Sequence, residues 1–110
     1  MATTPSAVVT AQVDAFNVRD LDAFCATYAS EAAVSGVTPQ PIVGRDALRA
    51  FYADRFRDPE LHCVIDASVT FGDRWLVAHE LVTTSHGTSE TIATFEVRDG
   101  LITRASMVKG

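Results

Sequence analysis

The sequence of 110 residues has few cysteines, no run of basic residues and no long apolar stretch. Cys25 and Cys63 lie far apart and form neither a CxxC motif nor a Cys/His spacing typical of zinc sites. We therefore expect two reduced, buried thiols and no metal. Nine Lys and Arg against fourteen Asp and Glu give a net charge of −5. This acidic balance argues against binding to the phosphate backbone of a nucleic acid.

A membrane-spanning helix requires roughly 18 or more apolar residues in succession, and no segment approaches that length. The first residues also lack the basic region and the apolar stretch of a secretory signal, so we expect a cytoplasmic protein with no membrane partner. Hydrophobic residues nevertheless make up 47% of the sequence. That is enough for one core, and the length predicts a single domain over residues 1–110.

Apolar residues recur at helical spacing in three segments of the N-terminal half. The first segment covers residues 5–18, with Thr4 as its N-cap. The second is a short helix that begins after Asp20, and the third opens at Gly44 and ends before Pro59. Their apolar stripes carry, in turn, Val9, Val13 and Phe16; Leu21, Phe24, Cys25 and Tyr28; and Leu48, Phe51, Tyr52 and Phe56.

From Leu61 onward the period changes from 3.6 to 2, which is typical of β-strands. Turn residues separate the segments, so the pattern predicts a four-stranded meander joined by hairpins. Helices followed by a meander exclude a parallel βαβ sheet and predict an α+β fold with helices on one face of an antiparallel sheet. The expected strands are Leu61–Phe71, Arg74–Ser85, Ser89–Arg98 and Leu101–Val108, with a brief extended piece at residues 33–35.

A two-residue turn at residues 72–73 would place Asp66 opposite His79 and Val64 opposite Leu81. A carboxylate beside an imidazole fixes its tautomer and raises its basicity, so Asp66 and His79 are the candidate catalytic pair on the side that faces the pocket. Two alternatives stay open. In the first, His79 is a hydrogen-bonded core histidine. In the second, a turn of another length separates the two residues, because a register shift of one residue turns every side chain of the strand to the opposite face of the sheet.

Both faces of the predicted sheet are largely apolar. Three helices can cover only one of these faces, and a second apolar face usually meets a partner, most often a copy of the same chain. The sequence therefore predicts a homodimer that associates through the outer face of the sheet.

The order helix, helix, short strand, helix and four-stranded meander resembles the nuclear transport factor two-like superfamily, which includes ketosteroid isomerases and SnoaL-like polyketide cyclases. The most specific matching stretches are FNVRDLDAFCATYASEAAV, VGRDALRAFYADRF and FEVRDGLI. The resemblance implies a cone-shaped α+β barrel, commonly dimeric, in which three N-terminal helices pack in the concave face of a curved, mainly antiparallel sheet. It does not imply one activity, because the superfamily contains several enzyme types and non-catalytic binders.

The catalytic positions of ketosteroid isomerases fall here at Gln12, Gly36 and Ala93, none of which supplies the tyrosine, the base or the acid of that reaction. We therefore expect a different function. By the same resemblance, Tyr28 and Tyr52 match positions that line the pocket. The full set of expected ligand-binding residues is Gln12, Tyr28, Tyr52, Trp75, Phe95 and Met107.

Two function classes remain open from the sequence. One is a SnoaL-like enzyme of the isomerase, cyclase or dehydratase type, in which His79, oriented by Asp66, moves a proton on an apolar substrate. The other is a binding or dimeric interaction module with the same fold and no reaction. In either case we expect a small apolar molecule as the partner and no cofactor.

Overall fold

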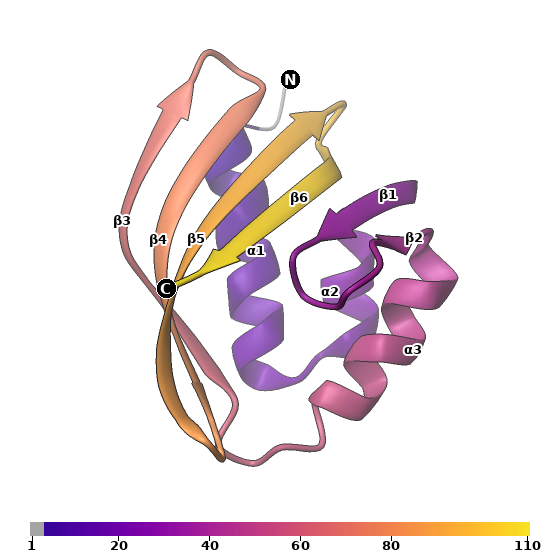
Figure 1. The fold of residues 1–110 in the computed structure, drawn as a ribbon. Helices are drawn as coiled ribbons and strands as arrows, with labels where there is room; N and C mark the ends of the chain where they lie inside the picture. The colour runs from indigo at the N-terminus through magenta and orange to yellow at the C-terminus, as the bar shows by residue number, and fades with distance from the viewer. Residues whose placement is uncertain (1–3) are drawn as a thin grey trace.

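Three helices pack against a six-stranded curved sheet in residues 4–110, the part of the chain that the computed structural model describes (Figure 1). The strand order is β2-β1-β6-β5-β4-β3, and all neighbours are antiparallel except β1 and β6. The predicted α+β fold is confirmed. The elements are α1 Pro5–Val18, α2 Leu21–Ala26, β1 Tyr28–Ser35, β2 Ile42–Val43, α3 Arg45–Arg55, β3 His62–Phe71, β4 Trp75–Thr84, β5 Gly87–Arg98 and β6 Leu101–Lys109.

The first two helices begin where the sequence places their caps. The hydroxyl of Thr4 accepts a hydrogen bond from the Ala7 amide at 3.1 Å, and the Asp20 carboxylate accepts one from the Ala23 amide at 3.0 Å. Each cap satisfies an amide that has no partner within its helix. The prediction that Tyr28 shares the stripe of α2 is wrong, because this helix ends at Ala26 and Tyr28 begins β1.

The hairpin between β3 and β4 differs from the predicted register near its turn. Phe71 pairs with Trp75, so the turn contains three residues, 72–74, instead of two. A bulge between Ile65 and Ala67 then inserts one extra residue on β3. The two insertions offset each other, and Val64 pairs with Leu81 as predicted. The predicted pairing of Asp66 with His79 is wrong, because Asp66 is the extra residue of the bulge and His79 pairs with Ala67.

The N-terminal part of the sheet is longer than the sequence indicates. β1 covers eight residues and not only residues 33–35, and it runs parallel to β6, with Val34 paired to Ala105. β2 pairs with β1. Together these strands close the sheet over α2 and α3 at the end away from β3 (Figure 1).

The core between helices and sheet is built around aromatic rings. The ring centroids of Phe24 and Tyr52 lie 4.6 Å apart, and Phe24 and Phe56 lie 5.4 Å apart. Cys25 and Cys63 are both free and buried, as predicted. Among residues 4–110, no helix combines the length and the apolar character needed to cross a membrane.

Candidate functional site

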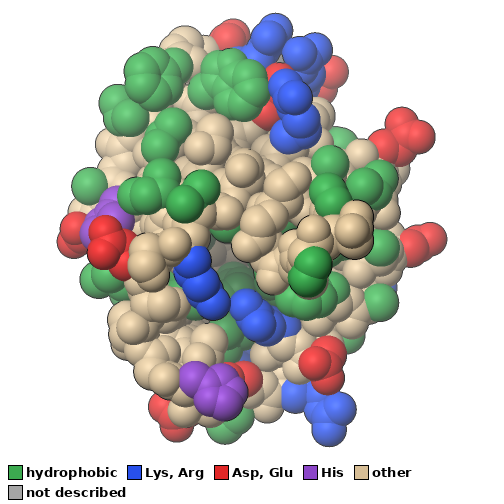
Figure 2. Space-filling view, in the orientation of Figure 1, with side chains coloured by type: hydrophobic (Ala, Val, Ile, Leu, Met, Phe, Trp, Pro, Cys, Tyr) green, Lys and Arg blue, Asp and Glu red, His purple; other side chains and the backbone are tan. Residues whose placement is uncertain are grey.

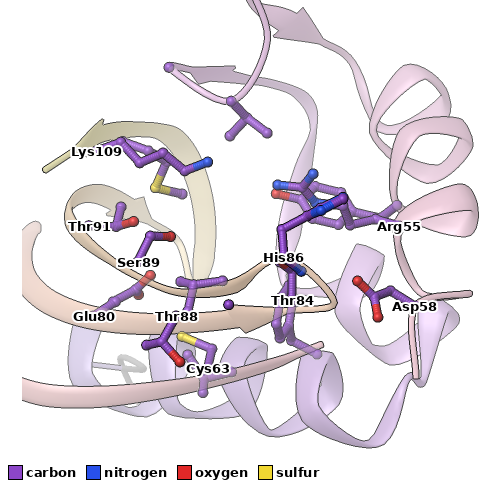
Figure 3. A pocket seen from close by; sticks show the side chains of 18 of the residues that line it. Arg55, Asp58, Cys63, Glu80, Thr84, His86, Thr88, Ser89, Thr91 and Lys109 are labelled. Carbon is purple, nitrogen blue, oxygen red and sulfur yellow. The ribbon is translucent and has the colours of Figure 1, made fainter. Parts of the chain in front are cut away.

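A pocket of about 500 Å³ lies between the helices α1 and α3 and the inner face of the sheet (Figure 3). Part of its wall is apolar and part is polar, and the sheet contributes side chains from β3, β4, β5 and β6. The volume is within the range of about 300–1,000 Å³ that is usual for small-molecule sites. The apolar side chains of the wall are Val13, Phe16, Val37, Val82 and Met107.

Gln12 brings a buried amide to this pocket from α1. Its side chain is only 6% exposed, its Nε2 donates to the Tyr28 hydroxyl at 3.1 Å, and its Oε1 has no partner among the described residues. The Tyr28 hydroxyl contacts only one end of the amide, so either orientation of the amide leaves one polar atom unsatisfied. An unsatisfied buried polar atom costs about 1–3 kcal/mol, which a ligand with a matching group would recover.

Glu80 is the second buried polar group of the pocket. It lies on the inner face of β4 at 6% exposure, and burial raises its pKa, an effect that the nearby Cys63 thiol opposes. Burial and the neighbouring carboxylate in turn raise the pKa of Cys63 to about 12, so this thiol stays protonated. A carboxyl group that resists ionisation can exchange a proton with a ligand more readily than an ordinary glutamate at neutral pH.

Cys63 faces the pocket because the start of β3 is fastened to the end of α1. The Asn17 side chain donates to the Cys63 carbonyl at 2.8 Å and accepts from the Cys63 amide at 2.8 Å. The Arg19 guanidinium donates to the Leu61 carbonyl at 2.7 Å. These bonds set the position at which β3 enters the sheet and therefore the side that its residues before the bulge face.

Tyr52 reaches the pocket from α3. Burial raises the pKa of its phenol to about 12, so the hydroxyl remains neutral and can both donate and accept a hydrogen bond. Its ring packs edge-on against Phe16, another residue of the pocket wall. Tyr52 therefore combines a packing role with a polar group at the pocket surface.

Charged side chains from α3 and β6 border the mouth of the pocket. Arg55 and Lys109 extend toward the cavity from opposite sides (Figure 3), and Lys and Arg side chains border a hollow in the space-filling view (Figure 2). The Asp58 carboxylate accepts hydrogen bonds from the Ser85 and Glu60 amides at 2.9 Å each, and these bonds lower its pKa. Asp58 is thus occupied in holding the loop structure at the mouth.

Three of the six residues expected to bind the ligand line this pocket: Gln12, Tyr52 and Met107. Tyr28 is fully buried behind Gln12, and Phe95 is fully buried in the core. Trp75 lies on the outer face, where the Arg104 guanidinium stacks over its ring at 5.6 Å.

His79 and Asp66 do contact each other, but on the outer face of the sheet. His79 Nδ1 lies 3.2 Å from Asp66 Oδ2, and its Nε2 lies 3.0 Å from Glu90 Oε1. The hydrogen bonds to Glu90 and Asp66 raise the pKa of the imidazole. The prediction that this pair faces the pocket is wrong, because its neighbour Glu80 faces inward and adjacent strand residues point to opposite faces.

The sequence did contain a signal for Glu80. Along β4, every second residue from Leu76 to Val82 faces the core, and a glutamate interrupts this apolar series. A charged residue at an inward position of a strand is a stronger indication of a site than a charged residue on the mixed outer face. In residues 4–110, no three His, Cys, Asp or Glu side chains gather as a metal site would require.

The sequence pattern of the SnoaL-like domain matches residues 9–105. A comparison with curated proteins finds no significant match. Solved structures share the fold. One is a nuclear transport factor two-like protein from Cytophaga hutchinsonii, with 14% identity, a TM-score of 0.83, and coverage of 100% of this chain and 92% of that chain.

Two further structures bear on the pocket. A candidate ketosteroid isomerase from Kribbella flavida has 19% identity and a TM-score of 0.81, covering 94% of this chain and 76% of that one. A computationally designed 17-OHP binder has 16% identity and a TM-score of 0.84, covering 100% and 98%. At these identities the likeness concerns the fold alone.

Proposed function

Because the chain belongs to the SnoaL-like domain family, we propose that it binds a small, partly apolar molecule in the pocket described above. The observation that carries this proposal is a pocket of about 500 Å³ whose lining residues include Gln12, a buried amide with one polar atom that has no partner among the described residues. Natural proteins rarely leave such an atom unsatisfied unless a ligand or water completes its bonding. The designed binder with the same fold supports the view that this architecture accommodates a small ligand.

Substitution inside the pocket tests the proposal directly. Val82 lines the pocket, whereas Val77 lies on the opposite face of the same strand, so a Val82→Trp variant and a Val77→Trp variant form a matched pair. We expect Val82→Trp to remove the thermal stabilisation that small apolar ligands give, because the indole fills the cavity. Val77→Trp should retain it. Equal ligand stabilisation of both variants would contradict the proposal.

A second function, proton transfer on the bound molecule, is favoured by Glu80. This buried carboxyl group lines the pocket, burial raises its pKa, and its described neighbour is a weakly polar thiol. These are the properties of a general acid or base that acts at neutral pH. We expect the native protein to turn over a bound carbonyl compound. The Glu80→Gln variant should bind the same compound without turning it over, and unchanged turnover in that variant would exclude the role.

We also propose that the chain forms a homodimer through the outer face of the sheet. Large apolar side chains remain exposed there in the single chain, including Ile92 at 42% and Val64 at 47%. Several large apolar side chains exposed on one face of a sheet are typical of an interface. The remaining exposed apolar side chains on this face are Val69, Phe71 and Val108.

Light scattering tests the dimer. We expect twice the chain mass for the native protein at micromolar concentration and the single-chain mass for Ile92→Glu, because a new unpaired charge buried in the interface costs more than the contact returns. A single-chain mass for the native protein would contradict the dimer.

The two free, buried cysteines are consistent with the predicted cytoplasmic location.

A further inference from the structure

The basic side chains at the pocket mouth differ from most others in residues 4–110, because neither a carboxylate nor a backbone carbonyl accepts a hydrogen bond from them. The Arg55 guanidinium lies over the Phe51 ring, 5.5 Å from its centroid. Of the nine Lys and Arg, four pair with a carboxylate and two donate to backbone carbonyls. Three remain: Arg55, Arg74 and Lys109. Two of these three, Arg55 and Lys109, line the pocket, whereas Arg74 lies in the exposed turn between β3 and β4.

Among the described residues, neither acidic side chain at the same mouth forms an ion pair with Arg55 or Lys109. The Asp58 carboxylate accepts hydrogen bonds from two backbone amides. Asp54 forms its ion pair with Arg57, at 3.9 Å, and not with Arg55. Arg55 and Lys109 approach the opening from α3 and β6, two elements that are distant in sequence (Figure 3). Two unpaired cations thus flank one entrance in a chain whose overall charge is −5.

We propose that the pocket selects amphipathic organic anions, with the anionic head between Arg55 and Lys109 and the apolar body against Phe16, Val82 and Met107 inside. The inference rests on the proposed small-molecule binding and adds the chemical class of the ligand.

Two fluorescent probes distinguish the contribution of the anionic group to binding from the contribution of the aromatic rings. 1-Anilinonaphthalene-8-sulfonate and N-phenyl-1-naphthylamine share the same rings and the same N–H, but only the first carries an anionic group. We expect the native protein to bind both and to bind the sulfonate more tightly. This preference should shrink as salt is added, since exposed charges are screened beyond about 10 Å at roughly 0.1 M ionic strength.

The variant Arg55→Met/Lys109→Met tests the source of the preference. We expect about fivefold weaker binding of the sulfonate, in line with two partly exposed ion pairs, and unchanged binding of the neutral probe. Arg74→Met removes the third unpaired cation and serves as the control, with both affinities unchanged. The neutral probe also shows whether the double variant keeps its pocket.

The possible failures are distinguishable. Equal affinities of the native protein for the two probes, or an equal loss of both in the double variant, would overturn the selection of anions and leave the proposed binding function in place. If neither probe bound the native protein, the proposed function itself would be contradicted, and the inference with it. A loss in Arg74→Met as large as in the double variant would show a general effect of charge and would also overturn the inference.

Discussion

Glu80→Gln should stabilise the protein at neutral pH and leave its stability unchanged in acid. Burial raises the folded pKa of Glu80 above its usual value of 4.5, and the only described neighbour that opposes this shift is a thiol. The unfolded chain therefore ionises first as pH rises. The free energy of unfolding falls from about pH 4.5 until the folded group also ionises, and it stays lower above that point.

The magnitude follows from the burial of the side chain. Glu80 is 6% exposed, and a buried polar group without a good partner costs about 1–3 kcal/mol. Glutamine keeps the size of the side chain without the charge. We expect Glu80→Gln to raise the free energy of unfolding by on the order of 1 kcal/mol at about pH 7, which corresponds to a rise in Tm of about 4–8 °C for a domain of this size.

Urea unfolding followed by circular dichroism at about pH 4 and pH 7 would measure the effect. Glu96 provides a control of opposite sign, because it is equally buried but Arg104 and Thr103 hold its pKa at about 2. The stabilising contribution of the ionised Glu96 is present above pH 4.5 and is lost as the pH falls toward the folded pKa. Glu96→Gln should therefore destabilise the protein at neutral pH. A stability gain in Glu80→Gln that is the same at both pH values would refute this reasoning.

Three further predictions concern the core, a close backbone approach and the outer face. Phe24→Ala should lower the free energy of unfolding by about 3–5 kcal/mol in urea titrations, because its ring is fully buried; a loss under about 1 kcal/mol would count against the packing described. Gly36→Ala should lower the Tm far more than Gly72→Ala, because a Cβ at Gly36 would lie 1.9 Å from a carbonyl oxygen of β6, whereas a Cβ at Gly72 would meet nothing within 4 Å. Similar losses of Tm in the two variants would contradict this close approach of Gly36 to β6. His79→Gln should be less stable than the native protein below about pH 6.5, and this difference should shrink as the pH rises through the raised folded pKa of His79, with ligand affinity unchanged. A loss of thermal stability that does not depend on pH, or a loss of ligand affinity, would contradict the placement of His79 on the outer face.

The helices and the meander could be predicted because their signals are local. Thr4 and Asp20 cap the first two helices, and the change of period after Leu61 marks the first strand of the meander. The pocket positions of Gln12 and Tyr52 came instead from the family resemblance, whereas the caps and the change of period are local features. Such features depend on neighbours within a few residues, so one sequence is sufficient to show them.

The face of the sheet that the helices cover was not predictable in the same way. Both faces are apolar, and the choice depends on tertiary packing, in which small residues such as Ala78 and Ala93 lie fully buried beneath the helices. That choice placed His79 outside and Glu80 inside. The parallel pairing of β1 with β6 joins segments about 70 residues apart, a separation that strand propensity does not encode.

Methyl NMR during a titration with N-phenyl-1-naphthylamine would test the binding pocket most directly. Val82 and Met107 report on the cavity, while Val77 and Leu81 report on the outer face of the same sheet. We expect saturable shifts of the Val82 and Met107 methyl signals with the outer signals unmoved. Shifts confined to Val77 and Leu81 would show that the small molecule binds elsewhere and would contradict the proposed function.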